Sequence, residues 1–385
     1  MKRSAERILT THTGSLPRPD DLLELLDSAE AGTLRDDTVL NNRVRTAVAE
    51  VVRKQAETGI AIVNDGEMGK IGYATYPKDR LTGFEGPMAP DGGFMESDVS
   101  DFPRFVKVFL QALGRPVTGL KRPQCNGPIK YKNRNDLDRD LANLKDALKG
   151  AAVEETFMTA ASPGVIAVFL GNSYYKTHEA YLAALADAMK VEYEAIHKAG
   201  FLLQVDCPDL ALGHHVQFND ARLDEYRSNP DLHIEALNHA LAGIPPERVR
   251  MHLCWGNYEG PHHKDIPLEK IIDRVYRARP AGISFEASNP RHEHEWKVFK
   301  DHKLPDGKVL IPGVIDSVSN FIEHPELVAQ RICNLAQVVG RENVIAGTDC
   351  GFGTFAGLSA VDGDIAWRKL RSLAEGAGIA SRELW

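Results

Sequence analysis

The segment THEAYLAALADAMKVEYEAIHKAGFLLQVDCPD, residues 177–209, contains the repeating unit that decides the fold. Apolar residues recur every three or four positions over His178–Lys198, which is the spacing of an amphipathic helix. Thr177 is suited to cap the start of this helix, and Gly200 is suited to end it. A short apolar run, Leu202–Val205, follows immediately and is typical of a buried strand. A helix followed directly by a strand is the unit from which parallel sheets are built.

The same alternation of helix and strand extends along the chain in both directions. Eight short apolar runs have the length and composition of strands. They are Ile8–Thr13, Ala61–Asn64, Val165–Leu170, Leu202–Val205, Val249–Cys254, Gly282–Glu286, Val309–Val314 and Val344–Gly347. Further helices are expected at Val39–Glu57, Pro267–Arg277 and Pro325–Val339. Eight strands separated by helices predict an α/β fold of the (β/α)8 or TIM barrel type, in a single domain spanning residues 1–385.

One interval, residues 78–148, is too long and too irregular to be a single crossover helix. It contains Pro-rich and Gly-rich stretches mixed with apolar residues, such as those in Gly83–Gly93. We expect it to form an insertion after the second strand that packs over one end of the barrel.

The composition limits the classes of protein that this chain can represent. It is 43% hydrophobic and 26% charged, as in ordinary globular proteins, with no run of about 18 to 20 apolar residues that could span a membrane. Its formal net charge of −8 argues against nucleic acid or an anionic membrane as a partner. With no apolar signal segment and an odd number of cysteines, five, we expect reduced thiols and a cytoplasmic location. The sequence is compatible with a homo-oligomer but marks no interface.

Polar clusters stand at the carboxyl ends of nearly all the expected strands. The clusters are His12–Ser15, Asn64–Glu67, Asp206–Asp209, His252–Cys254, Glu286–Ser288, Asp316 and Thr348–Gly351. In a barrel these ends meet on one face, where the active sites of this fold lie. The convergence of so many polar groups therefore predicts an active site.

Three of these residues have the chemistry of a metal site. His252 and Cys254 are two residues apart on a strand, so their side chains point to the same side. Cys350 follows the last strand, which lies beside the first strand when the barrel closes. One imidazole and two thiolates suit zinc, and three protein ligands leave a fourth position open, as in catalytic sites. Glu286 is the candidate for that exchangeable fourth position.

The ordered set of motifs resembles the catalytic barrel of cobalamin-independent methionine synthase and its short single-barrel relatives. The matching segments are His12–Pro19, Asp65–Glu67, Val205–Pro208, His252–Cys254, Phe285–Glu286 and Asp349–Gly351. The resemblance implies a (β/α)8 fold and a Zn²⁺ ion held by His252, Cys254, Glu286 and Cys350. It also implies that Gly14 and Ser15 hold the carboxylate of a homocysteine-like thiol. Glu67 and Asp206 would then bind its ammonium group.

The implied chemistry is transfer of an alkyl group to a thiol. Zinc deprotonates a bound thiol and leaves a nucleophilic thiolate, which would attack the alkyl carbon of a second substrate. A hydrogen-bond donor would then assist the leaving group. Histidines on the strand-end loops are candidates for this role, namely His214, His215, His262, His263, His292 and His294. Among them we predict His215 as the catalytic donor and Asp316 as the residue that orients it.

The alkyl donor is left open by two departures from the family. Full-length methionine synthases of this type have two barrels, whereas this chain has one. In addition, Gly171–Tyr175 stands where the family presents a tryptophan that stacks on the pterin, although Tyr174 or Tyr175 could stack instead. The donor could be methyl-folate, a methylated cobalamin protein, an S-methyl or sulfonium compound, or an epoxide.

Three alternatives to methyl transfer remain at this point. The chain is also similar to epoxyalkane:coenzyme M transferases, in which a sulfonate thiol would favour a cation such as Arg18 or Lys70 near the site. A zinc-dependent hydrolase would activate water, but two thiolates reduce the Lewis acidity of the metal. A non-catalytic zinc-binding protein would not need anion and cation sites beside the metal.

Overall fold

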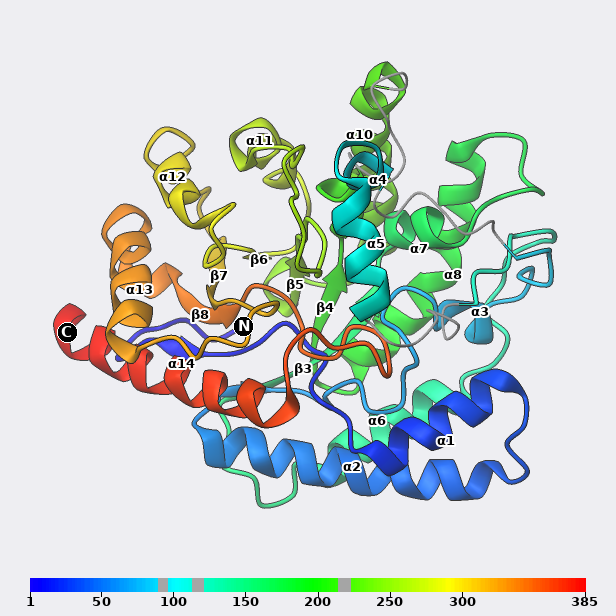
Figure 1. Ribbon diagram of the computed structural model, residues 1–385, viewed down its shortest axis with the longest axis horizontal. Helices are drawn as coiled ribbons and strands as arrows, with labels where there is room; N and C mark the ends of the chain where they lie inside the picture. The colour runs from blue at the N-terminus through cyan, green and yellow to red at the C-terminus, as the bar shows by residue number, and fades with distance from the viewer. Residues whose placement is uncertain (89–95, 113–120, 214–222) are drawn as a thin grey trace.

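The chain folds into eight parallel strands surrounded by helices (Figure 1). The computed structural model describes residues 1–88, 96–112, 121–213 and 223–385. The strands are β1 Leu9–Thr10, β2 Ile62–Val63, β3 Glu155–Ala161, β4 Leu202–Asp206, β5 Val249–His252, β6 Gly282–Phe285, β7 Val309–Ile315 and β8 Ile345–Thr348. They are hydrogen-bonded in the order β1-β8-β7-β6-β5-β4-β3-β2. Ala61 N donates to the Thr10 carbonyl at 3.1 Å, which brings β2 to β1. The predicted barrel is therefore confirmed.

The helices pack around this barrel and against one another. Four long helices are α2 Asp37–Thr58, α8 His178–Lys198, α13 Pro325–Val339 and α14 Gly363–Leu384. The others are α1 Asp20–Ala31, α3 Pro77–Arg80, α4 Glu96–Asp101, α5 Pro103–Ala112, α6 Asn135–Ala147, α7 Pro163–Phe169, α10 Leu223–Ala240, α11 Ile272–Val275 and α12 Val298–Asp301. Helices α8 and α13 have the predicted bounds. The expected helix Pro267–Arg277 is present as a 3-10 turn, Leu268–Lys270, followed by α11.

The unit that decided the fold is formed by the local interactions that its sequence predicts. Thr177 Oγ1 accepts a hydrogen bond of 3.2 Å from Ala180 N and so caps the first turn of α8. After the helix, Gly200 has a φ of +94°, a left-handed conformation that glycine adopts without a steric penalty. This turn sends the chain directly into β4.

The third predicted strand, Val165–Leu170, is wrong. This segment is helix α7, and the third strand is β3, ten residues earlier. Ser162 Oγ accepts a hydrogen bond of 3.0 Å from Val165 N, and Pro163 occupies the first helical position. Ser followed by Pro is a helix start signal, and it overrides the strand propensity of the short apolar run.

Two clusters of buried apolar side chains stabilise the barrel. The larger cluster contains residues of both strands and helices, and the smaller one includes Phe157, Leu202 and Ile311 of the strands. The buried Arg250 guanidinium lies over the Phe157 ring at 4.0 Å from its centre. It donates to Gln204 Oε1 at 2.7 Å and to the His12 carbonyl at 2.6 Å. Arg250 therefore ties β5 to β4 and to the end of β1.

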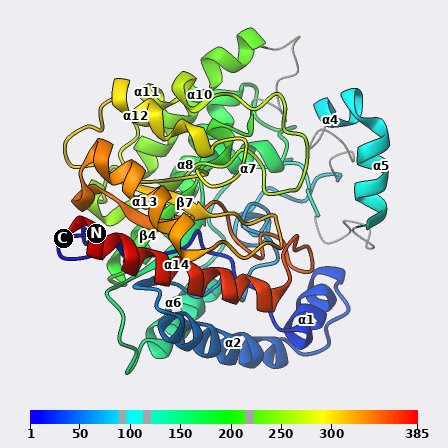
Figure 2. The same ribbon diagram turned by 60° about the vertical axis from the view of Figure 1, so that its left-hand side comes forward.

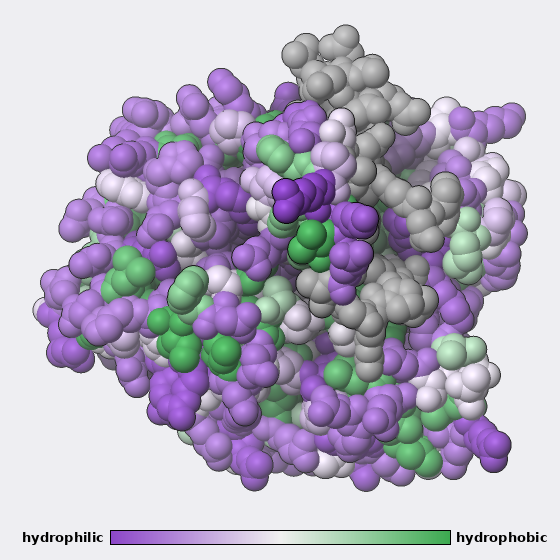
Figure 3. Space-filling model, in the orientation of Figure 1, coloured by the Kyte–Doolittle hydropathy of each residue, from purple (hydrophilic) through white to green (hydrophobic). Residues whose placement is uncertain are grey.

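The interval between β2 and β3 contains several short helices. Helix α6 packs against α2 on the outside of the barrel. Helices α4 and α5 stand at one edge of the molecule, away from α13 and α14 (Figure 2). Polar residues predominate on the face shown in Figure 3, and hydrophobic residues form small separate groups. Within the described residues, no helix combines the length and the apolar character of a membrane span.

Candidate metal centre and substrate cavity

A cavity of about 510 Å³ contains side chains from the carboxyl ends of several strands. The polar residues that line it come from the segments that follow β1, β2, β4, β5, β7 and β8. They include Thr13, Ser15, Glu67, Asp206, His252, Cys254, Ser317 and Cys350. The clusters that the sequence places at separate strand ends therefore meet in one space, which is where this fold carries its active sites.

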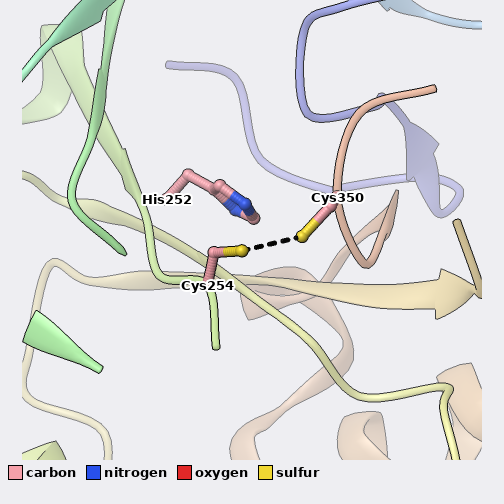
Figure 4. Close-up of side chains that lie close together, drawn as sticks. All are labelled: His252, Cys254 and Cys350. Atoms are coloured by element: carbon pink, nitrogen blue, oxygen red, sulfur yellow. Dashed lines mark hydrogen bonds between the residues drawn. The ribbon is translucent and has the colours of Figure 1, made fainter. Parts of the chain in front are cut away.

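Three potential metal ligands lie together in this cavity. The ligand atoms of His252, Cys254 and Cys350 all lie within 4.8 Å of one another, and all three residues are buried. Figure 4 shows the imidazole ring and the two sulfur atoms pointing toward one another, and the sulfurs are 3.1 Å apart. The residues predicted as metal ligands from their spacing are thus brought together by β5 and the turn after β8.

The electrostatics of this cluster favour a bound cation. Burial, together with the contact with Cys254, raises the pKa of the Cys350 thiol well above its usual value. Burial lowers the pKa of His252 to about 3, so its imidazole is neutral and can act as a ligand. Ser284 Oγ lies 3.2 Å from His252 Nδ1 and orients the ring. Nitrogen and sulfur donors in this number fit zinc, which would compensate the charge of two thiolates.

Glu286 lies at the edge of the cluster. Its Oε1 is 3.8 Å from Cys350 Sγ and accepts a hydrogen bond of 2.8 Å from Trp255 N. Its Oε2 accepts from Arg291 Nη2 at 2.6 Å and from Asn289 Nδ2 at 2.7 Å. The carboxylate is therefore close to the thiols but is held by several donors of its own.

Asp349 organises the loop that carries Glu286, a role that the sequence analysis missed. Its carboxylate accepts backbone hydrogen bonds of 2.8 to 3.0 Å from Ala287, Ser288 and Asn289. Since Asp349 immediately precedes Cys350, the loop after β6 and the turn after β8 are locked together. An aspartate directly before a candidate thiol ligand was the only signal available in the sequence.

Glu67 and Asp206 form the acidic part of the cavity. Glu67 Oε1 accepts a hydrogen bond of 2.7 Å from Thr159 Oγ1, while the buried Oε2 has no hydrogen-bond partner among the described residues. Asp206 Oδ1 accepts from Gln204 Nε2 at 2.8 Å. Burial and the neighbouring charge of Glu67 raise the pKa of Asp206 to about 8. Two buried carboxylates with unused acceptor capacity are suited to a ligand that carries an ammonium group.

The turn after β1 approaches these residues closely. Gly14 has a φ of +147°, and a Cβ atom there would lie 2.7 Å from Thr159 Cγ2. A Cβ atom on Gly351 would collide with Ser15 Oγ. Glycine at both positions allows the Gly14–Ser15 turn to lie against Glu67 on one side and the Cys350 turn on the other.

The structure describes only some of the residues that were candidates for assisting the leaving group. His214 and His215 lie outside the described residues. Asp316 Oδ1 accepts a hydrogen bond of 3.0 Å from Val318 N and caps the turn after β7. Its neighbour Ser317, rather than Asp316, lines the cavity, and Ser317 Oγ accepts from Cys350 N at 3.1 Å.

Aromatic side chains form much of the remaining wall of the cavity. They are Tyr73, Phe109, Tyr258, Phe352 and Phe355. In the sequence analysis they carry no signal of a site, because they are ordinary apolar or aromatic residues of loops and of α5. Tyr174, considered there for stacking, is half-exposed and is not among the lining residues.

Comparisons with known proteins agree with the architecture. No family model matches the chain. It is similar to methionine synthase of Thermococcus kodakarensis, with 25% identity over 97% of this chain and 94% of the relative. Methionine synthase of Sulfolobus acidocaldarius is 26% identical over 97% of this chain and 93% of the relative. These relatives confirm the predicted resemblance over nearly the whole length.

Solved structures show the same fold. A B12-independent methionine synthase from Shewanella sp. W3-18-1, in complex with selenomethionine, superposes with a TM-score of 0.71 at 19% identity, covering 98% of this chain and 99% of that one. A putative vitamin-B12 independent methionine synthase from Listeria monocytogenes gives a TM-score of 0.67 at 17% identity, with the same coverage.

Proposed function

We propose that this chain is a zinc-dependent methyltransferase that methylates the thiol of homocysteine, the reaction of its methionine synthase relatives. The observation that carries the proposal is the position of the thiol cluster. His252, Cys254 and Cys350 line the same cavity as two buried carboxylates, Glu67 and Asp206. A metal site for sulfur and a recognition site for an ammonium group are the two features that an amino-acid thiol requires.

The metal would be held by His252, Cys254 and Cys350, with Glu286 as the ligand that a substrate thiol replaces. When bound, zinc lowers the pKa of a substrate thiol and keeps the thiolate nucleophilic. Arg291 and Asn289 bind the outer oxygen of Glu286. They give this carboxylate partners whether or not it is a metal ligand, which suits an exchangeable position.

The rest of the amino acid would be bound by the residues around the cluster. Glu67 Oε2 and Asp206 would accept hydrogen bonds from the ammonium group, in addition to those that Glu67 Oε1 and Asp206 Oδ1 already accept. The Gly14–Ser15 turn would hold the carboxylate through backbone and hydroxyl donors. His215, as the proton donor, and Asp316, as its orienting partner, belong to this proposal as further positions to be tested.

A sulfonate thiol, as in the epoxyalkane:coenzyme M transferases, fits this cavity less well. The two cations considered for it have other partners. Arg18 donates to the backbone carbonyls of Gly353 and Glu67 at 2.6 and 2.8 Å. Lys70 Nζ donates to Thr159. A sulfonate would therefore meet two carboxylates rather than a cation.

Residues of the cavity also disfavour the other two alternatives: the thiols argue against a hydrolase, and the carboxylates argue against a non-catalytic zinc protein. Two thiol ligands donate charge to a metal and weaken its ability to acidify water. A protein that only stores zinc gains nothing from buried carboxylates beside the ligands, because each one carries a desolvation cost.

The decisive experiment is X-ray absorption spectroscopy of the zinc-loaded protein with and without homocysteine. We expect the zinc shell to gain one sulfur and lose one oxygen or nitrogen ligand. A spectrum that does not change under saturating homocysteine would overturn the proposal. Mass spectrometry of the products formed with a panel of alkyl donors then tests whether methionine is made.

A further inference from the structure

Five aromatic residues line the cavity that contains the metal cluster, and several of their rings pack against one another. The Tyr73 and Phe355 rings have centroids 5.5 Å apart, and those of Phe109 and Tyr258 are 6.2 Å apart. The Tyr258 hydroxyl donates to Asp98 Oδ2 at 2.7 Å, which fixes the ring at the cavity wall. Aromatic faces carry negative electrostatic potential and attract organic cations, above all methylated onium groups.

The charged residues of the cavity also favour binding of a cation. Three carboxylates line it, those of Glu67, Asp206 and Glu259, and no lysine or arginine is among its described lining residues. Bound homocysteine would bring one positive group, its ammonium, together with a carboxylate and a thiolate. The two cysteine thiolates would compensate the charge of the zinc ion, and the ammonium and carboxylate groups of the substrate compensate each other. The substrate thiolate, together with the carboxylates of Glu67 and Glu259, therefore leaves the cavity electronegative, and a cationic second substrate is attracted to it.

Three of the histidines considered as proton donors, His262, His263 and His292, are held by other groups. His292 contacts Glu295 Oε2 at 2.7 Å and Asp265 Oδ2 at 3.1 Å through its two ring nitrogens. His263 Nε2 contacts Asp101 Oδ2 at 2.8 Å. His262 lies 3.1 Å from the Tyr258 carbonyl. A methyl donor whose leaving group departs without a proton needs neither these three histidines nor the proton donor proposed at His215, whereas an amine donor such as methyl-folate must be protonated.

We infer that the methyl donor is an onium ion, either a sulfonium or a quaternary ammonium compound, bound against the aromatic wall that includes Tyr73 and Phe355. This inference rests on the proposed function. In the transfer, the substrate sulfur forms a bond to the methyl carbon, and the bond from that carbon to the onium centre breaks. The electron pair of the broken bond stays with the leaving heteroatom, which departs as a neutral sulfide or tertiary amine. The thiol proton is released to solvent.

The first test measures, by calorimetry, the binding of cationic and neutral ligands to the zinc-loaded protein saturated with homocysteine. Choline is compared with its neutral isostere 3,3-dimethylbutan-1-ol, and trimethylsulfonium is titrated as the second cation. We expect choline to bind more tightly than the neutral alcohol. Equal affinities of choline and the alcohol, or no binding of either cation, would overturn the inference.

Phe355→Leu separates cation recognition from simple apolar contact. We expect choline affinity to fall about fivefold, the equivalent of one cation–π contact, with no matching loss for the neutral alcohol. Leu358→Ala is the matched control, because Leu358 lines the same cavity without a ring, and it should affect both ligands alike. A Phe355→Leu protein that loses both ligands equally would contradict the inference.

The second test is turnover with homocysteine and methyl-labelled trimethylsulfonium, choline or methyl-tetrahydrofolate. Labelled methionine from either onium compound supports the inference and identifies which heteroatom is used. Labelled methionine from the folate alone overturns it while leaving the proposed function in place. Homocysteine affinity is measured first, because failure of homocysteine to bind overturns the proposed function itself.

Discussion

Lys70 Nζ donates hydrogen bonds to both oxygen atoms of Thr159, at 2.7 Å to the carbonyl and at 3.0 Å to the side-chain hydroxyl. The same hydroxyl donates to Glu67 Oε1 at 2.7 Å. Because the ammonium group of Lys70 occupies the acceptor side of the hydroxyl, the hydroxyl proton is directed at Glu67. Through Thr159 on β3, Lys70 thus orients the carboxylate of Glu67, which is proposed to bind the substrate.

Thr159→Val removes this hydroxyl while keeping the shape of the side chain. We expect homocysteine binding to weaken by about 1.5 to 3 kcal/mol, the usual worth of a hydrogen bond to a charged group. The effect should appear in KM for homocysteine, with kcat changed little, and Thr159→Ser should restore wild-type values. Equal behaviour of the valine and serine variants would show that Thr159 acts only in packing.

Loss of either thiol should remove the metal. We expect Cys254→Ser and Cys350→Ser to contain far less than one zinc per chain after dialysis, as measured by inductively coupled plasma mass spectrometry. Cys333→Ser is the control, because Cys333 lies on α13 beside Glu383 and outside the cluster. Full zinc content in both cluster variants would refute the proposed ligand set.

Glu67→Gln tests recognition of the ammonium group. We expect homocysteine to bind about 10- to 100-fold more weakly, the equivalent of a lost charge-assisted hydrogen bond. The thiol 4-mercaptobutanoate, which lacks the amino group, should bind equally well to both proteins. If the two thiols lose affinity equally, Glu67 does not contact the amine.

Gly14→Ala tests the close approach of the turn after β1. The new Cβ atom would lie 2.7 Å from Thr159 Cγ2, and the φ of +147° is unfavourable for alanine. We expect a loss of about 1 to 3 kcal/mol in the free energy of unfolding by urea. Gly171→Ala is the control, since its Cβ atom would meet its nearest neighbour at 3.6 Å. A Gly14→Ala protein of wild-type stability would exclude steric restriction at this turn.

His12 should make the protein sensitive to acid. Burial lowers the pKa of His12 to about 3, whereas an unfolded histidine titrates near 6.5. The unfolded chain therefore binds more protons between these values, and stability is lost as the pH falls from 6.5 toward 3. The slope from this residue approaches about 1.4 kcal/mol per pH unit.

The measurement is urea unfolding at pH 4.5 and pH 7. His12→Asn keeps a polar group near Gly14 N and Gln55, which contact the ring at 3.2 and 2.8 Å. We expect its unfolding free energy to fall less between the two pH values than that of the wild type. An unchanged difference would mean that His12 is not the group responsible.

Much of the barrel could be predicted because its elements carry local signals. Helix α8 has a capping threonine, a helical period and a terminating glycine, and its bounds were predicted without error. The failure at β3 has a consequence for the site. Because the sequence pattern predicts the third strand at Val165–Leu170, it does not identify Thr159 as a strand residue, and the contact of Thr159 with Glu67 cannot be predicted from it.

The cluster of His252, Cys254 and Cys350 could be predicted because these residue types are unusual and their strand ends must converge. The cavity wall could not be predicted in the same way. Phe109 and Phe355 are ordinary apolar residues in the sequence, and only the packing of α5 and the last loop brings them to the cavity. Long-range contacts of loops carry no periodic signal that a single sequence reveals.

The pairing of β1 with β8 also sets the order of events when the protein is made. Leu9 is aligned with Ile345, and the Cys350 turn lies against Ser15. A nascent chain that has reached only β7 contains His252 and Cys254 but not the third ligand. Its first strand also has no partner on that side. If zinc is bound as proposed, its third protein ligand is made only after the eighth strand, so the complete ligand set would form late in synthesis, when β8 can pair with β1.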